Sequence, residues 1–198
     1  MNIAELVIAG VGAAVLAASV AGARHPVIHP AEIRAFQAVN GLPGWLYPVL
    51  WLPMQLGNLV VGPAVGLVVA WSLGSWRVAI GVLLATWAKL VVERLVRKQV
   101  AQYLTIRQRP GTSQPVATLR GADVPDHGPS FPSGHVILVA AVGTVLTSHL
   151  IGTLVWIPFA LAIVVALGRV YVGAHNPLDV TAGLGAGLLI GGIIALVF

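Results

Sequence analysis

The chain has 198 residues, of which 58% are hydrophobic and only 9% are charged, and its formal net charge is +5. Soluble domains carry about 25% charged residues, so this composition excludes a water-soluble globular enzyme and predicts a membrane protein. The sequence has no cysteine, which excludes disulfide frameworks, thiol nucleophiles and cysteine-based metal sites. Lys and Arg residues in membrane loops set topology and contact anionic headgroups, and this role explains the positive charge without a nucleic-acid partner.

The length bounds the number of membrane crossings. A spanning helix needs about 20 apolar residues, so the chain allows about five to seven spans and leaves no room for a separate soluble domain. We therefore expect a single membrane domain over residues 1–198. The first apolar run, residues 3–21, predicts a retained first helix. Residues 24–44 mix charged side chains with apolar ones at helical spacing, which predicts an amphipathic helix in the membrane interface.

The rest of the chain alternates apolar runs with short breaks. Residues 45–73 contain prolines and glycines and predict a tilted or kinked second span. A third span is expected from residue 76 to about 92, continuing as a polar helix toward Gln102. Residues 107–131 are rich in proline and glycine and predict a long polar loop. Three further runs, 134–150, 153–171 and 178–198, complete an all-α fold with six transmembrane helices and one interfacial helix.

The last run contains a stripe of small residues. Gly183, Gly187 and Gly191 recur at four-residue intervals, so they fall on one face of a helix. Such a stripe lets two membrane helices approach closely, and we expect it to serve packing.

Polar residues gather at four places that helix parity puts on one side of the membrane. These places are the end of the third span, the start of the fourth, the end of the fifth and the start of the sixth. Polar side chains at membrane depth are costly and therefore indicate function. Arginines offer forked donors that match phosphate oxygens, and the first turn of a helix offers free N–H groups. The four places carry Arg109, the run Phe131-Pro-Ser-Gly-His135, Arg169, and His175-Asn-Pro-Leu-Asp179, a set that predicts a phosphate site.

Two histidines in such a site indicate a nucleophile and a general acid. Pro177 fits the first position of the last helix with Asn176 as its N-cap, which places His175 just before the helix and Asp179 in its first turn. We expect Asp179 to accept a hydrogen bond from one ring nitrogen of His175 and to leave the other nitrogen as the nucleophile. His135 is then the general acid. The site lacks a carboxylate cluster suited to Mg²⁺, so we expect neither a metal nor a cofactor.

These residues resemble the three motifs of the type 2 phosphatidic acid phosphatase (PAP2) superfamily of membrane lipid phosphatases. The motifs are Lys-x6-Arg-Pro, Pro-Ser-Gly-His and Ser-Arg-x5-His-x3-Asp, and the resemblance covers essentially the whole chain. It implies that His175 forms a transient phosphohistidine, that Asp179 orients it and that His135 protonates the leaving group. It also implies that the phosphoryl oxygens are held without a metal by Arg109, Arg169, Ser133 and the amide of Gly134. The matching residues here are Arg109-Pro110, Pro132-Ser133-Gly134-His135, and Arg169 with His175 and Asp179.

Two positions depart from the family pattern. Gly168 stands where the family has Ser, and Gln102 stands where the family has Lys. The second change removes a cation expected on the phosphate. Lys98, one helical turn earlier on the same face, is one candidate replacement, and Arg107 is another. A site that functions with less positive charge is the remaining alternative.

The sequence thus predicts a multi-pass integral membrane phosphatase of a bacterial plasma membrane. The expected substrates are a polyprenyl phosphate or diphosphate, a polyprenyl-phosphosugar phosphate, phosphatidic acid or phosphatidylglycerophosphate. The missing family lysine keeps a second hypothesis open, a non-catalytic lipid-phosphate binder or transporter. Most Lys and Arg residues fall on the face of the site, and the positive-inside rule places that face in the cytoplasm. The sequence predicts no oligomeric state.

Overall fold

The computed structural model describes residues 3–25, 27–103, 107–122 and 124–198, and for residues 97–103 it describes the backbone only. Within these ranges the chain is helical, apart from irregular loops and one isolated antiparallel bridge between Gln108 and Pro129. The predicted all-α class is therefore confirmed.

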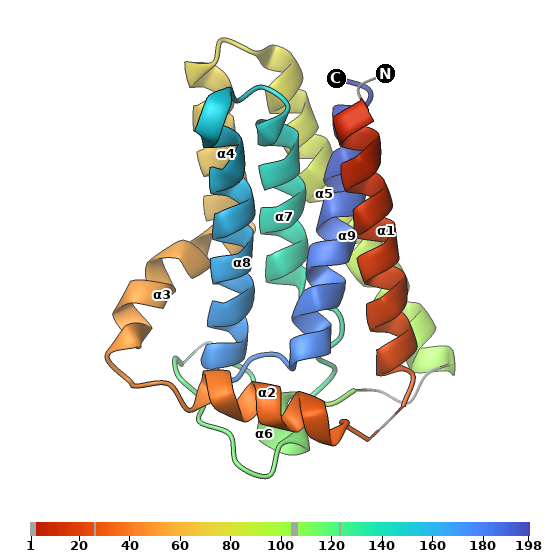
Figure 1. The fold of residues 1–198 in the computed structure, drawn as a ribbon, viewed down its shortest axis with the longest axis vertical. Helices are drawn as coiled ribbons and strands as arrows, with labels where there is room; N and C mark the ends of the chain where they lie inside the picture. The colour runs from red at the N-terminus through yellow and green to blue at the C-terminus, as the bar shows by residue number, and fades with distance from the viewer. Residues whose placement is uncertain (1–2, 26, 104–106, 123) are drawn as a thin grey trace.

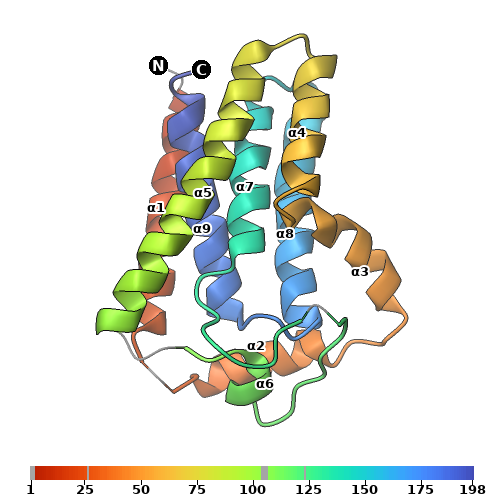
Figure 2. The same cartoon turned by 180° about the vertical axis from the view of Figure 1, so that it is seen from behind.

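A bundle of roughly aligned helices forms the body of the molecule (Figures 1 and 2). Two short helices, α2 and α6, lie across one end of the bundle, and both chain termini lie at the opposite end (Figure 1). The aligned helices are α1 (Ile3–Ala23), α4 (Val61–Ser72), α5 (Trp76–Tyr103), α7 (Gly134–Thr147), α8 (Trp156–Tyr171) and α9 (Pro177–Ala195). The connecting elements are α2 (Pro30–Asn40), α3 (Leu46–Met54), η1 (Gln55–Gly57), α6 (Pro110–Ser113) and η2 (Gly152–Val155).

Three helical segments in the described ranges are long and apolar enough to cross a membrane, and a bent pair adds a fourth candidate. The three are Ile3–Ala23, Gly152–Tyr171 and Pro177–Ala195, and the pair is Leu46–Gly57 with Val61–Ser72. Helix α7 is apolar but has only 14 residues. The chain is therefore an integral membrane protein with three or four candidate spans among the described residues, and six crossings stay a prediction.

The predicted kink in the second span is confirmed. Helices α3 and α4 meet at an angle of 72° across a short break. Pro53 lies near the end of α3, and a Cβ at Gly62 would lie only 2.3 Å from the carbonyl oxygen of Leu56. The chain bends sharply at this break, so the two helices cannot form one continuous straight helix. The break brings η1 against the start of α7.

Helix α9 packs closely against α1 on one side and α7 on the other. A Cβ at Gly187 would lie 2.5 Å from the Cβ of Ala140 in α7. On the other side, a Cβ at Gly185 would lie 2.5 Å from the backbone nitrogen of Leu16 in α1. The predicted packing role of the glycine stripe is therefore confirmed on the α7 side, and Gly185, outside the stripe, serves the α1 side. Because α9 lacks side chains at these contacts, its backbone approaches both neighbours directly.

Helix α2 covers the end of the bundle that carries the predicted site. It buries Glu32, Phe36 and Asn40, which are spaced four residues apart, and leaves Arg34 exposed. The side-chain amide of Asn40 donates to the carbonyl oxygens of Thr118 and Tyr171, both at 2.9 Å. The expected amphipathic helix in residues 24–44 is therefore present. Its buried Asn40 binds it to the loop at Thr118 and to the end of α8 at Tyr171.

The two ends of the bundle offer a test of sidedness, because the chain has no native cysteine. Val116 is 72% exposed in the loop at the site end, and Ile151 is 81% exposed between α7 and η2 at the other end. The positive-inside rule predicts that a membrane-impermeant thiol reagent labels Ile151→Cys but not Val116→Cys in intact cells. Labelling of both in permeabilised cells is the control, and the reverse pattern in intact cells would place the site outside.

Candidate active site

A cavity of about 440 Å³ opens where α5, α7, α8 and the loop before α9 meet. It gathers five of the residues predicted from the motifs, although they come from segments up to 66 positions apart by residue number, from 109 to 175. The five are Arg109, Gly134, His135, Arg169 and His175. The same wall also includes Gly57, Asn58, Lys89, Glu93 and Pro132.

A sharp turn after the end of α8 allows Arg169 and His175 to line the same cavity. Gly173 adopts φ +79°, a left-handed conformation that glycine takes readily. The next amide, that of Ala174, donates to the carbonyl oxygen of Arg169 at 3.0 Å, so the chain folds back over the last helical turn. Arg109 secures this turn from the loop, since its Nη1 donates to the carbonyl oxygen of Ala174 at 2.8 Å.

Asp179 lies behind His175 rather than on the cavity wall. As predicted, Asn176 is the N-cap of α9 and Pro177 takes its first position. The amide of Asn176 donates to Asp179 Oδ2 at 2.8 Å. The Nδ1 atom of His175 is 3.9 Å from the same oxygen, too far for a hydrogen bond. The expected His175–Asp179 hydrogen bond is therefore wrong for this structure: the two groups are in electrostatic contact, and Oδ2 already accepts the N-cap amide.

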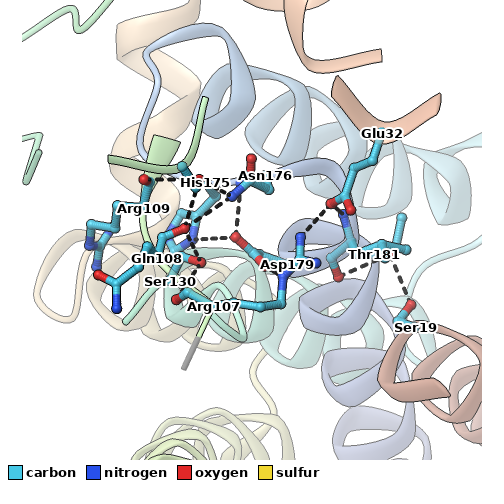
Figure 3. A network of polar contacts seen from close by, with 12 residues as sticks. Ser19, Glu32, Arg107, Gln108, Arg109, Ser130, His175, Asn176, Asp179 and Thr181 are labelled. Atoms are coloured by element: carbon cyan, nitrogen blue, oxygen red, sulfur yellow. Dashed lines mark hydrogen bonds and ion pairs between the residues drawn. The ribbon is translucent and has the colours of Figure 1, made fainter. Parts of the chain in front are cut away.

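Arg107 lies between two buried carboxylates, those of Glu32 and Asp179 (Figure 3). Its Nε donates to Asp179 Oδ1 at 3.1 Å, and its Nη2 donates to Glu32 Oε1 at 2.5 Å. The same Glu32 oxygen accepts the amide of Leu178 in the first turn of α9, at 2.9 Å. Arg107 is buried and directed at these carboxylates, so its charge serves Asp179 rather than the cavity. Glu32 is the partner that sequence reasoning missed.

The surroundings of His175 favour its neutral form. Burial lowers the pKa of His175 and the nearby Arg169 guanidinium lowers it further, whereas Asp179 acts in the opposite direction. The imidazole is therefore uncharged at neutral pH and keeps an electron pair on one ring nitrogen. This is the form that a nucleophilic histidine requires.

The start of α7 forms the opposite wall. Gly134 and His135 line the cavity, and a Cβ at Gly57 in η1 would lie 2.6 Å from the Cβ of His135. The broken second span therefore packs directly on the predicted general acid. Ser133 is the N-cap of α7 and is fully buried behind this wall. Its hydroxyl has no hydrogen-bond partner among the described residues.

Of the two predicted replacements for the family lysine, Arg107 is engaged by Glu32 and Asp179. The side chains of Lys98 and Gln102 lie outside the described residues. Lys89 and Glu93, which sequence reasoning missed, line the cavity and form an ion pair of 2.5 Å. The signal that could have found them is a Lys-Glu pair four residues apart inside an apolar run. Among the described residues, no group of three or more His, Asp and Glu side chains is placed to hold a metal ion.

Comparison with known proteins shows the family to which the chain belongs. The family model described as the PAP2 superfamily matches residues 75–198. This chain belongs to the PAP2 superfamily. The bacitracin transport permease protein BcrC of Bacillus licheniformis is 31% identical to it over 164 residues, which are 80% of this chain and 76% of that protein. The family model confirms the family that the motifs indicated, and the chain is a bacterial integral membrane phosphatase.

Two solved structures share the fold of this PAP2 phosphatase. Aquifex aeolicus LpxE superimposes with a TM-score of 0.69 at 26% identity, covering 87% of this chain and 99% of LpxE. A transmembrane PAP2 type phosphatidylglycerolphosphate phosphatase from Bacillus subtilis gives a TM-score of 0.70 at 20% identity, covering 96% of this chain and 93% of that one. Both matches extend beyond the region of the family model, so the fold is shared over most of the chain.

The contact between η1 and α7 predicts a loss of activity in Gly57→Ala. The new methyl group would force His135 away from its position, and a displacement of about 1 Å in a catalytic group can cost about 100-fold in rate. We expect kcat/KM for phosphate release to fall by about 10-fold or more. Gly10→Ala is the control, because a Cβ at Gly10 meets no atom within 4 Å. Equal activity of the two variants would contradict the prediction that the Gly57–His135 contact positions His135 for catalysis.

The Arg107 network predicts a loss of stability in Arg107→Gln. The variant leaves the carboxylates of Glu32 and Asp179 buried without their shared cation, which we expect to cost about 3–5 kcal/mol. Thermal unfolding in detergent measures this loss. Arg34→Gln on the exposed face of α2 is the matched control. An Arg107→Gln protein as stable as the control would show that the network contributes little.

Proposed function

We propose that this phosphatase removes a terminal phosphate from a lipid phosphate or diphosphate through a phosphohistidine intermediate on His175. The observation that supports it best is the shared cavity of Arg109, Arg169, His135 and His175, with Asp179 directly behind His175. Two arginines match the charge of a phosphate group, and the two histidines provide a nucleophile and an acid on opposite walls.

The first chemical step forms a bond from His175 to phosphorus. The Nδ1 atom faces Asp179, so Nε2 is the attacking atom, and the bond from phosphorus to the lipid oxygen breaks. His135 gives its proton to that oxygen as it leaves. Asp179 stabilises the positive charge that His175 gains. Arg109 and Arg169, with the amide of Gly134 at the start of α7, stabilise the charge on the phosphoryl oxygens.

The second step returns the enzyme to its starting state. Water attacks phosphorus while His135, now unprotonated, accepts a proton from it. The bond from phosphorus to His175 breaks and inorganic phosphate leaves. The hydroxyl of Ser133 is buried behind the start of α7 without a partner among the described groups, and we propose it as a further donor to a phosphoryl oxygen. None of these steps calls for a metal ion.

An apolar cavity near the site suits the hydrocarbon tail of the substrate. It has a volume of about 220 Å³ and lies between α4, α7 and α8. Its lining begins at Leu56, next to Gly57 of the polar cavity, and continues through Val65, Val69 and Val142. A lipid whose headgroup occupies the polar cavity can therefore place its tail along these helices.

The bundle of aligned helices supports a proposal for the membrane arrangement. We propose six crossings of a bacterial plasma membrane, made by α1, the bent pair α3–α4, α5, α7, α8 and α9, with residues 1–198 acting as one unit. The polar end then faces the headgroups, and the positive-inside rule places it in the cytoplasm. The substrate classes that fit are polyprenyl phosphates and diphosphates, polyprenyl-phosphosugar phosphates, phosphatidic acid and phosphatidylglycerophosphate. The last is the substrate class named for the Bacillus subtilis structure of the same fold.

A binder or transporter of lipid phosphates is the second candidate. One observation favours it: the BcrC relative is named as a transport permease. The absence of the family lysine at Gln102 is consistent with weakened chemistry. Phosphate release distinguishes the two, because a transporter needs neither the nucleophile nor the acid.

The test is phosphate release by purified protein from a panel of lipid phosphates and diphosphates, with and without EDTA. We expect release that EDTA does not change, and its loss in His175→Ala and in His135→Ala. His149→Ala is the matched control, since His149 lies beyond the end of α7, away from the cavity. Wild-type protein that binds lipid phosphates but releases no phosphate would favour the binder or transporter. Retained turnover in His175→Ala would overturn the mechanism.

A further inference from the structure

Two charged residues of α5 line the catalytic cavity without matching any family motif. Lys89 is only 6% exposed and pairs with Glu93 one helical turn later, with 2.5 Å between Nζ and Oε2. Both side chains belong to the cavity wall that also carries Arg109, His135, Arg169 and His175. A buried ion pair is costly to desolvate and is by itself weak evidence of a stabilising role. Its position on the cavity suggests a role in binding.

The charge of the cavity matches an anionic ligand. The described lining residues include three cations, Lys89, Arg109 and Arg169, and one carboxylate, that of Glu93. These charged side chains give the wall an excess of positive charge, which an incoming phosphate compensates. Arg107 cannot add to it, because it is already engaged by Glu32 and Asp179. Among the lysines whose side chains are described, Lys89 is therefore the one placed to supply the positive charge that the family has at position 102.

Glu93 occupies the place where a phosphate is expected. A Cβ at Gly134 would lie 2.9 Å from Glu93 Oε2 and 3.0 Å from Oε1, so both carboxylate oxygens pack against the first residue of α7. The start of a helix carries unpaired N–H groups and the positive end of its dipole, and it attracts anions. The carboxylate thus takes the position of an anion between this helix start and the ammonium group of Lys89.

We propose that Lys89 is a substrate-binding residue that takes over the role of the missing family lysine, and that Glu93 holds it in the unliganded site. A phosphate group entering the cavity displaces the Glu93 carboxylate from the start of α7 and pairs with the Lys89 ammonium. The inference rests on the proposed function for the identity of the anion. It assigns two residues outside the family motifs to the binding step.

Binding of inorganic phosphate to the purified full-length protein tests the proposal without turnover. Loss of a charge-assisted hydrogen bond in Lys89→Met should raise the Kd for inorganic phosphate by about 10- to 100-fold. Lys89→Arg keeps the charge and should recover most of the affinity. Glu93→Gln removes the competing anion and should lower the Kd by several-fold. Arg77→Met is the matched control, since Arg77 is exposed at the far end of α5.

A purely structural ion pair predicts a different pattern. Lys89→Met and Glu93→Gln would then lower the unfolding temperature together and shift phosphate affinity in the same direction. The proposal predicts opposite shifts in Kd, and the same opposite shifts in KM for the lipid substrate. Kd values for both variants equal to that of the Arg77→Met control, or both raised, would overturn it.

Failure of the proposed function and failure of this inference give different experimental results. Wild-type protein that releases no phosphate from any lipid, yet binds inorganic phosphate in a manner that depends on Lys89, would reject catalysis and retain this inference. Normal turnover by the wild type with unchanged Kd and KM in Lys89→Met would reject this inference alone.

Discussion

The close approach of α7 and α9 at their starts is the constraint on which the rest of the site depends. A Cβ at Gly183 would lie 2.8 Å from the carbonyl oxygen of Ser133, and the amide of Ser133 donates to the carbonyl oxygen of Asp179 at 3.0 Å. Each helix start carries a catalytic candidate, His135 on α7 and His175 just before α9. Two positive helix ends thus lie side by side, which favours the binding of an anion between them.

Charge compensation beneath the cavity allows the site to be buried. Arg107 lies between the carboxylates of Glu32 and Asp179, and Glu32 also accepts the amide of Leu178. Helix α2 is therefore more than an interfacial anchor, because it supplies a carboxylate to the start of α9. Arg109, Arg169 and Lys89 line the cavity itself. This division separates the cation that contacts Asp179 from those on the cavity wall.

Much of the architecture was predictable from the sequence, because hydrophobic runs and helix-start residues act locally. The kink within residues 45–73, the N-cap at Asn176 and the packing of the glycine stripe follow from rules that need only neighbouring residues. The pairing of Arg107 with Glu32 was not predictable, because it joins residues 75 positions apart. The role of Lys89 and Glu93 was not predictable for another reason. Their position on the cavity wall depends on how α5 lies along the site, which the local sequence does not determine. The 3.9 Å separation between His175 and Asp179 also depends on the exact turn at Gly173, which motif spacing does not fix.

The central claim is that His175 carries the phosphoryl group between the lipid and water. Rapid quenching of the protein during turnover of a radiolabelled lipid phosphate, followed by peptide mapping, tests it most directly. The account predicts a label that is stable to alkali and labile to acid, located on the peptide that contains His175. Turnover with no label on the protein at any time, or a label on a different residue, would contradict it.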